Sequence, residues 1–216
     1  MQEANLLANV QPGTYGAFEA WHTEGALTLA NLTAQEFRYF AEPAPDGEVV
    51  VVSAAFDLMP VSSQSVQAVP QPAPPPMGAG LVYGLDPDVG TYFAVTLQDD
   101  ATLVLSRGDA AGMVEIQRYD VSGYVNTTGL TDLLTIVGEG DTIDVLLNGT
   151  PMFTYSDPTL DPTGHAGVFA HGQGTFTFWL YDAQPFARST EAGTEPVQPE
   201  EASPSGHVLD GGYLLE

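Results

Sequence analysis

The chain consists of short segments in which apolar and polar residues alternate, separated by clusters of glycine, proline, aspartate and asparagine. Alternation with a period of two is typical of strands that bury one face, and such clusters are typical of turns. The 23 glycines and 17 prolines among 216 residues are consistent with many turns between short strands. We therefore predict an all-β chain, with strands at 26–29, 48–58, 80–85, 92–97, 102–106, 113–119, 132–137, 142–147, 152–155, 166–170 and 175–181.

Residues 132–155 predict a meander of three consecutive strands. The sequence LTIV at 134–137 is followed by GEGD and then by TIDVLL at 142–147. Asn148 and Gly149 precede the third apolar run, and an Asn-Gly pair readily adopts the two positive φ angles of a type I′ turn. We expect these strands to pair as two antiparallel hairpins.

Three segments interrupt the strand pattern. Residues 33–36 read TAQE, a capping-box pattern that could open one helical turn, although a loop or a strand suits the following residues equally well. The proline-rich segment 61–77 predicts an exposed polyproline-like loop. After Phe186 the chain becomes polar, acidic and proline-containing, and at 207–216 it becomes apolar again. We expect one domain over 1–186, a flexible linker over 187–206 and a short tail over 207–216 able to act as a docking strand.

Charge and composition exclude several partners. The net charge is −24, because 28 acidic residues face 4 arginines and no lysine. Such a chain repels phosphate backbones and anionic headgroups, so we expect no nucleic-acid partner. The lack of cysteine and lysine excludes thiol and Schiff-base chemistry. No run approaches the roughly 18 apolar residues of a membrane span, so we expect no membrane insertion.

The segments AGLVYGL, YFAVTLQ, TLVLSRG, LLTIVGEGDTIDVLLNGTPMF, GHAGVFAHG and TFTFWLYD follow one another between Gly78 and Phe186. Their order resembles the concanavalin A-like lectin/glucanase superfamily, particularly its bacterial laminin-G-like members. The meander is the most specific part of this resemblance, residues 48–58 resemble an earlier strand, and the first 30 residues match weakly. The resemblance implies a two-sheet antiparallel jelly-roll sandwich, with ligands bound on a concave sheet or at a calcium-bearing rim.

The residues do not favour catalysis. Retaining glucanases need two carboxylates roughly 5 Å apart, which alternate positions of one strand supply. The sequence has no Glu-x-Asp-x-x-Glu run, and Glu115 and Asp120 would face opposite sides of a regular strand. No Gly-x-Ser-x-Gly motif for acyl transfer occurs either. We therefore expect a protein that is not an enzyme.

Sugar recognition commonly needs an exposed aromatic ring beside planar polar groups. The candidates for such a site are Trp179, Tyr181, Tyr119, Arg107 and Arg118. Regular alternation would place Trp179 and Tyr181 on one face of the last strand and Phe176, Phe178 and Leu180 on the other. Packing of both aromatic rows into a core is the alternative interpretation.

Calcium is the only cofactor that the acidic loops suggest. Asp86 and Asp88 are the candidate ligands, but DPD is also an ordinary turn sequence, and no acidic loop has EF-hand spacing. We therefore expect no cofactor, with weak calcium binding at a rim as the alternative.

These observations predict a noncatalytic jelly-roll module that binds glycans or cell-surface or matrix components, or that spaces other domains. Its setting would be extracellular or at the cell surface, which would require an export signal outside the sequence, because residues 1–10 lack signal-peptide character. The first alternative is a structural subunit that self-assembles into a homo-oligomer, filament or surface layer through edge strands or the tail. A glycoside hydrolase-like enzyme is the less favoured alternative, which release of reducing sugar from β-glucans would reveal.

Overall fold

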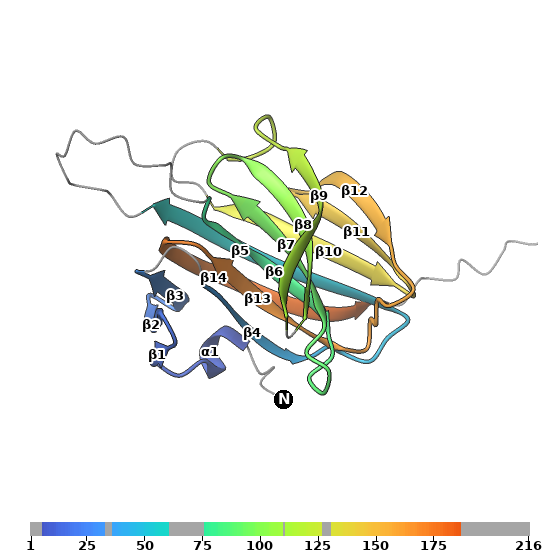
Figure 1. The fold of residues 1–216 in the computed structure, drawn as a ribbon, viewed down its shortest axis with the longest axis horizontal. Helices are drawn as coiled ribbons and strands as arrows, with labels where there is room; N and C mark the ends of the chain where they lie inside the picture. Colours follow the sequence, from blue (N-terminus) through green and yellow to red (C-terminus); the bar gives the residue numbers. More distant parts are fainter. Residues whose placement is uncertain (1–5, 33–35, 61–75, 110, 127–130, 187–216) are drawn as a thin grey trace, which may run out of the picture.

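The computed structural model describes residues 6–32, 36–60, 76–109, 111–126 and 131–186. Two antiparallel sheets pack face to face (Figure 1). The eight-stranded sheet has the order β1 (Gly13–Tyr15), β2 (Phe18–Thr23), β3 (Ala26–Asn31), β14 (Gly174–Phe186), β5 (Val49–Pro60), β10 (Asp132–Glu139), β11 (Thr142–Leu147) and β12 (Thr150–Ser156). The six-stranded sheet has the order β4 (Phe37–Pro43), β13 (His165–His171), β6 (Gly78–Leu85), β7 (Tyr92–Gln98), β8 (Thr102–Asp109) and β9 (Gly112–Asp120).

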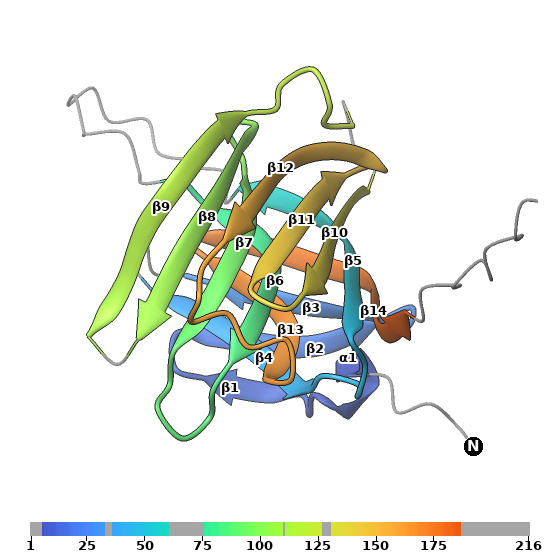
Figure 2. The same cartoon turned by 90° about the vertical axis from the view of Figure 1, so that its right-hand side faces the viewer.

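This architecture confirms the predicted all-β, two-sheet jelly roll. Each predicted strand is present, and β1, β2 and β4 are additional strands. The one helix among the described residues, α1 (Leu6–Asn9), contacts β3, β4 and β14 at the end of the sandwich that also carries β1 and β2 (Figures 1 and 2). This single turn is far too short to span a bilayer, and the described residues contain no other helix. The residues after the capping-box sequence form β4, which is one of the alternatives that the sequence left open.

The predicted meander is confirmed in detail. Strand β10 pairs with β11, and β11 pairs with β12. Asn148 and Gly149 have φ angles of 52° and 78°, as a type I′ turn requires. The Asn148 side chain accepts a hydrogen bond from the Leu133 backbone N–H at 2.8 Å and donates one to the Asp132 carboxylate at 2.7 Å. The turn is thereby tied to the start of β10.

The described part of the chain ends at Phe186, where β14 pairs with Val49, the first residue of β5. The linker and tail predicted at 187–216 lie outside the described residues, as does most of the proline-rich segment, 61–75. The predicted domain boundaries therefore stay predictions.

The core between the sheets is apolar and continuous. The inward residues of β5, β6, β7, β10 and β14 are buried, among them Val52, Leu81, Val95, Ile136 and Phe178. Burying side chains of this size contributes about 1.5–3 kcal/mol each to folding.

Tyr83 illustrates how tightly the two sheets meet. Its ring, on β6, lies directly over Gly138 of β10, so that a Cβ at position 138 would overlap the tyrosine hydroxyl. Burial raises the pKa of Tyr83 to about 12. Glycine is therefore required at 138 by the approach of the opposite sheet.

We predict that Gly138→Ala lowers the free energy of unfolding by about 1–3 kcal/mol, because the added methyl group must displace Tyr83 or the backbone. Gly123 is the matched control, since a Cβ there would meet nothing within 4 Å. Urea denaturation of the two variants measures the difference, and equal stabilities would contradict this account of the sheet contact.

Candidate functional site

A second hydrophobic cluster lies on the outer side of the six-stranded sheet. Along β6 and β7, Leu81 and Val95 belong to the core, whereas Val82 and Ala94 belong to this separate cluster together with Phe169. Successive side chains of a strand point to opposite faces, so these residues mark the face that points away from the eight-stranded sheet. We call it the front face.

The strand register aligns the front-face residues in rows that cross the whole sheet. One row crosses from β4 to β9 through Tyr39, Phe169, Gly80, Thr96, Val104 and Arg118. The neighbouring row contains Ala41, Gly167, Val82, Ala94, Ser106 and Glu115. Each row thus has small residues in its middle and ends in charged side chains at β9, and one of them begins with an aromatic ring at β4.

The β9 end of the front face carries a planar polar network. Arg118 donates hydrogen bonds from Nε and Nη2 to the two carboxylate oxygens of Glu115, at 3.0 and 2.7 Å. Its Nη1 atom donates to the Gln98 side-chain oxygen at 3.1 Å. The hydrogen bond from Arg118 holds the pKa of the Glu115 carboxyl below its usual value. Both charged side chains remain more than two-fifths exposed, so the pair adds little to stability but presents an ordered set of donors and acceptors.

The β4 end of the front face is aromatic. Phe37 stacks on Phe169 with ring centroids 5.7 Å apart and an interplanar angle of 15°, and Phe37 remains 38% exposed. Tyr39 packs against Tyr92 at 5.4 Å, and the Tyr92 ring lies over Gly108 of β8. A hollow of about 310 Å³ is lined by Phe37, Arg38 and Tyr39. This end therefore offers aromatic surface beside a shallow depression.

His171 lies between the two ends of the face. It pairs with Phe37 on one side and with Gly78 on the other, and Gly78 in turn pairs with Gln98. The Nε2 atom is buried and has no hydrogen-bond partner among the described residues. Burial lowers the pKa of His171 to about 4, so the imidazole is neutral at pH 7.

No family model matches the chain, and no curated protein matches it in sequence. Solved structures do match. The carbohydrate binding module CBM66 from Bacillus subtilis is 12% identical, with a TM-score of 0.59, and the match covers 77% of this chain and 91% of that one. A protein of unknown function with a galectin-like fold from Bacillus subtilis is 13% identical, with a TM-score of 0.53, and the match covers 78% and 86% of the two chains.

This chain has a concanavalin A-like jelly-roll fold. A third match, the GH43 BlXynB protein from Bacillus licheniformis, is 12% identical with a TM-score of 0.52, and it covers 79% of this chain but 35% of that protein. At these identities the likeness defines the fold alone. The narrower resemblance to laminin-G-like members stays a prediction.

In this concanavalin A-like sandwich, the five predicted sugar-binding residues do not form one site. Arg118 alone lies on the front face. Arg107 and Tyr119 pair with core-facing Phe93 and Leu103, and therefore point to the other side of the sheet. There the Tyr119 ring stacks on Phe153 at 4.6 Å.

Trp179 and Tyr181 lie on opposite sides of the eight-stranded sheet, which differs from the regular alternation that the sequence suggested. A β-bulge between Phe178 and Leu180 inserts one residue into β14. Tyr181 consequently joins Phe176 and Phe178 in the core, where burial raises its pKa. Trp179 and Leu180 are exposed.

Asp86 and Asp88, the predicted calcium ligands, lie in the turn that follows β6. The Asp86 carboxylate accepts hydrogen bonds from the backbone N–H groups of Asp88 and Val89, at 2.8 and 3.2 Å. Within the described ranges, no three or more His, Asp or Glu side chains come together in a way that could hold a metal ion.

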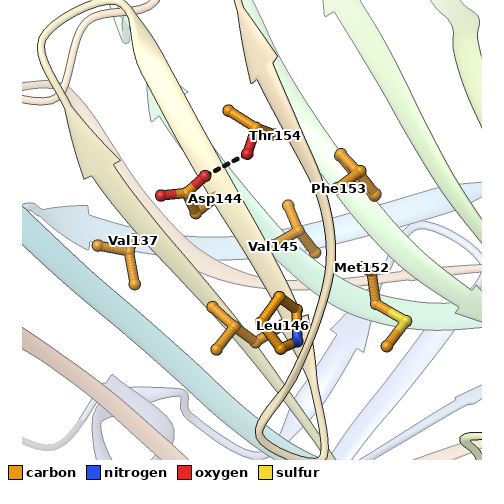
Figure 3. A pocket seen from close by; sticks show the side chains of 8 residues that line it. Val137, Asp144, Val145, Leu146, Met152, Phe153 and Thr154 are labelled. Atoms are coloured by element: carbon orange, nitrogen blue, oxygen red, sulfur yellow. Dashed lines mark hydrogen bonds between the residues drawn. The ribbon is translucent and has the colours of Figure 1, made fainter.

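A hollow on the outer side of the eight-stranded sheet is a weaker candidate for a site. It has a volume of about 450 Å³ and lies over β10, β11 and β12 (Figure 3). Val137, Leu146 and Met152 provide apolar lining, and its polar side chains Asp144 and Thr154 are hydrogen-bonded to each other. This leaves less polar capacity for a ligand than the front face has.

The sequence did not single out Gln98, Phe37 or Tyr39. Their only signal was their position in alternating segments, and the register across strands distant in sequence was needed to align them with Arg118.

We predict that His171 makes folding pH-dependent. Its folded pKa of about 4 lies below the ordinary 6.5, so the unfolded chain binds a proton first as pH falls. Burial of the neutral His171 ring therefore adds no pH dependence to the free energy of unfolding above pH 6.5. As the pH falls from 6.5 to 4, it lowers the free energy of unfolding progressively, by about 3 kcal/mol in total. Urea denaturation of the wild type and of His171→Gln at several pH values separates the effect of His171 from that of the carboxylates. Parallel pH profiles of stability for the two proteins would contradict the prediction.

We also predict that millimolar calcium raises the melting temperature by no more than a degree or two, because Asp86 is engaged by its own turn. Differential scanning calorimetry with calcium and with chelator measures this. A rise of many degrees that Asp86→Asn abolishes would instead establish a rim calcium site.

Proposed function

We propose that the protein is a glycan-binding jelly-roll module whose ligand lies on the front face. The observation that carries the proposal is the network of Arg118, Glu115 and Gln98, which shares that face with Phe37 and Tyr39. Gln98 lies three strand spacings, about 14 Å, from Phe37. A short oligosaccharide can span this separation, stacking on the rings while its hydroxyl groups meet the network.

The matched carbohydrate binding module supports this ligand class by fold, and the front-face chemistry supports it independently. The role is noncatalytic in our proposal, because both oxygens of Glu115 are committed to Arg118 and its lowered pKa disfavours a general acid. The setting that suits such a module is extracellular or at the cell surface.

Self-association is a second candidate function. Strand β9 is an edge of the six-stranded sheet, and its Met113 and Val114 side chains are exposed. An unpaired edge with apolar side chains and no lysine is open to pairing with another chain. The tail at 207–216, which the sequence also suggested for this role, lies outside the described residues.

We predict that Arg118→Met weakens oligosaccharide binding by about tenfold or more, because hydrogen bonds to a charged group contribute about 1.5–3 kcal/mol each. Screening on a glycan array identifies the ligand, and isothermal titration then measures the affinity. Arg107→Met is the matched control, since Arg107 lies on the opposite side of the same sheet. Equal losses in both variants, or binding to no glycan, would refute the front-face site.

A further inference from the structure

Both tryptophans of the chain lie on the outer side of the eight-stranded sheet, which we call the back face. On β2, Phe18 and Ala20 belong to the core, so Trp21 points away from it. On β14, Trp179 follows the core residue Phe178 and points to the same outer side, where it reaches Asp57. The two side chains are 37% and 44% exposed, which is unusual for the largest aromatic residue and calls for a physical explanation.

A row of the sheet connects the two indoles. It runs through Trp21, Thr28, Thr177 and Asp57 on four neighbouring strands. Trp179 reaches this row because its Nε1–H donates a hydrogen bond to the Oδ2 atom of Asp57 at 2.7 Å. The hydrogen bond satisfies the indole donor and holds the ring in place while leaving part of the ring in solvent.

The floor between the indoles consists of threonines. Thr28 and Thr177 are almost fully buried although they face outward, because larger neighbouring side chains shield them from solvent. The strand of Trp21 lies two strand spacings, about 10 Å, from the strand that carries Trp179. The second carboxylate oxygen of Asp57 is buried and has no hydrogen-bond partner among the described residues. The back face thus combines two partly exposed aromatic platforms with a low floor of threonine side chains between them.

The charge of the back face determines which classes of ligand it can bind. Glu19 lies in the next row of the sheet, beside the row that ends at Asp57. The described arginines, Arg38, Arg107 and Arg118, all belong to the six-stranded sheet. Anionic polymers are therefore repelled from the back face. Met59 and Leu180 are also exposed on this face, but threonines and a carboxylate separate Trp21 from Trp179, so the two indoles do not belong to one continuous apolar patch of the kind that a lipid or an apolar protein surface needs.

We propose that Trp21 and Trp179 form a second glycan-binding surface, which takes a neutral polysaccharide chain. Each indole offers a platform for the C–H face of a sugar ring, and the intervening polar groups suit its hydroxyls. The proposal shares its ligand class with the proposed front-face function but uses different residues on the opposite side of the sandwich. A molecule with both sites cross-links two glycan chains.

The chain offers a direct probe, because it contains only these two tryptophans. We expect a soluble neutral polysaccharide, tested as β-glucan, xylan and mannan, to shift tryptophan emission and to reduce acrylamide quenching. A polyuronate at the same concentration should change neither. No emission change with any of the neutral polymers would overturn the proposal.

Variants separate the two sites. We expect Trp21→Ala and Trp179→Ala each to weaken binding about tenfold in affinity electrophoresis. Tyr124→Ala, which removes another half-exposed aromatic ring, and Arg118→Met should leave the emission response of the back face intact. Melting temperatures check that each variant is folded.

The outcomes distinguish this inference from the front-face function. Binding lost in Arg118→Met but retained in both tryptophan variants overturns the back-face site alone. Binding lost only in the tryptophan variants supports it and leaves the front face without a ligand. Concentration-dependent light scattering without polysaccharide, abolished by Trp179→Ala, would instead identify a second copy of the chain as the occupant and overturn the proposal.

Discussion

The long antiparallel ladder between β5 and β14 is the constraint on which the other features depend. It pairs Val49–Pro60 with Gly174–Phe186 in the middle of the eight-stranded sheet, with one bulge between Phe178 and Leu180. Because side chains alternate with a period of two, one inserted residue reverses the faces for the rest of the strand. The bulge therefore allows Tyr181 to follow Phe178 into the core while Trp179 points to solvent. A regular strand would bury the indole or expose the tyrosine.

The front face depends on glycines that let neighbouring strands and aromatic rings approach the backbone closely. Tyr92 lies over Gly108, and a Cβ at Gly80 or Gly167 would overlap the backbone of the neighbouring strand. These glycines let the strands approach closely and let aromatic rings cover the sheet, which explains how Phe169 is fully buried on a side that faces away from the core. The same enclosure keeps His171 neutral. The exposed polar groups of this face lie at the β9 end, where Arg118 pairs with an exposed carboxylate and loses little hydration.

The sequence predicted the fold better than the site, for a physical reason. Strands such as β11 and the turn at Asn148 and Gly149 are specified by local periodicity and turn chemistry, and both were predicted correctly. The bulge beside Trp179 has no local signal, so regular alternation assigned Trp179 and Tyr181 to one face. The candidate site, by contrast, is assembled from strands far apart in the chain. Arg118 and Phe37 share the front face because of the register across six strands, which no single window of sequence contains.

The two sheets distribute charge unequally, and this asymmetry follows from which strands carry the arginines. In a chain of net charge −24, the described guanidinium groups all lie in β4, β8 and β9. The described rows around the back-face tryptophans have only carboxylates and neutral side chains, so the electrostatic potential there does not favour anionic ligands. The front face adds a fixed guanidinium that can direct hydrogen bonds. Since one core holds both sheets, the two faces keep a fixed relation to each other. If both proposed sites bind glycans, their ligands lie on opposite sides of one rigid body, and this geometry favours bridging two glycan chains over binding one chain more tightly.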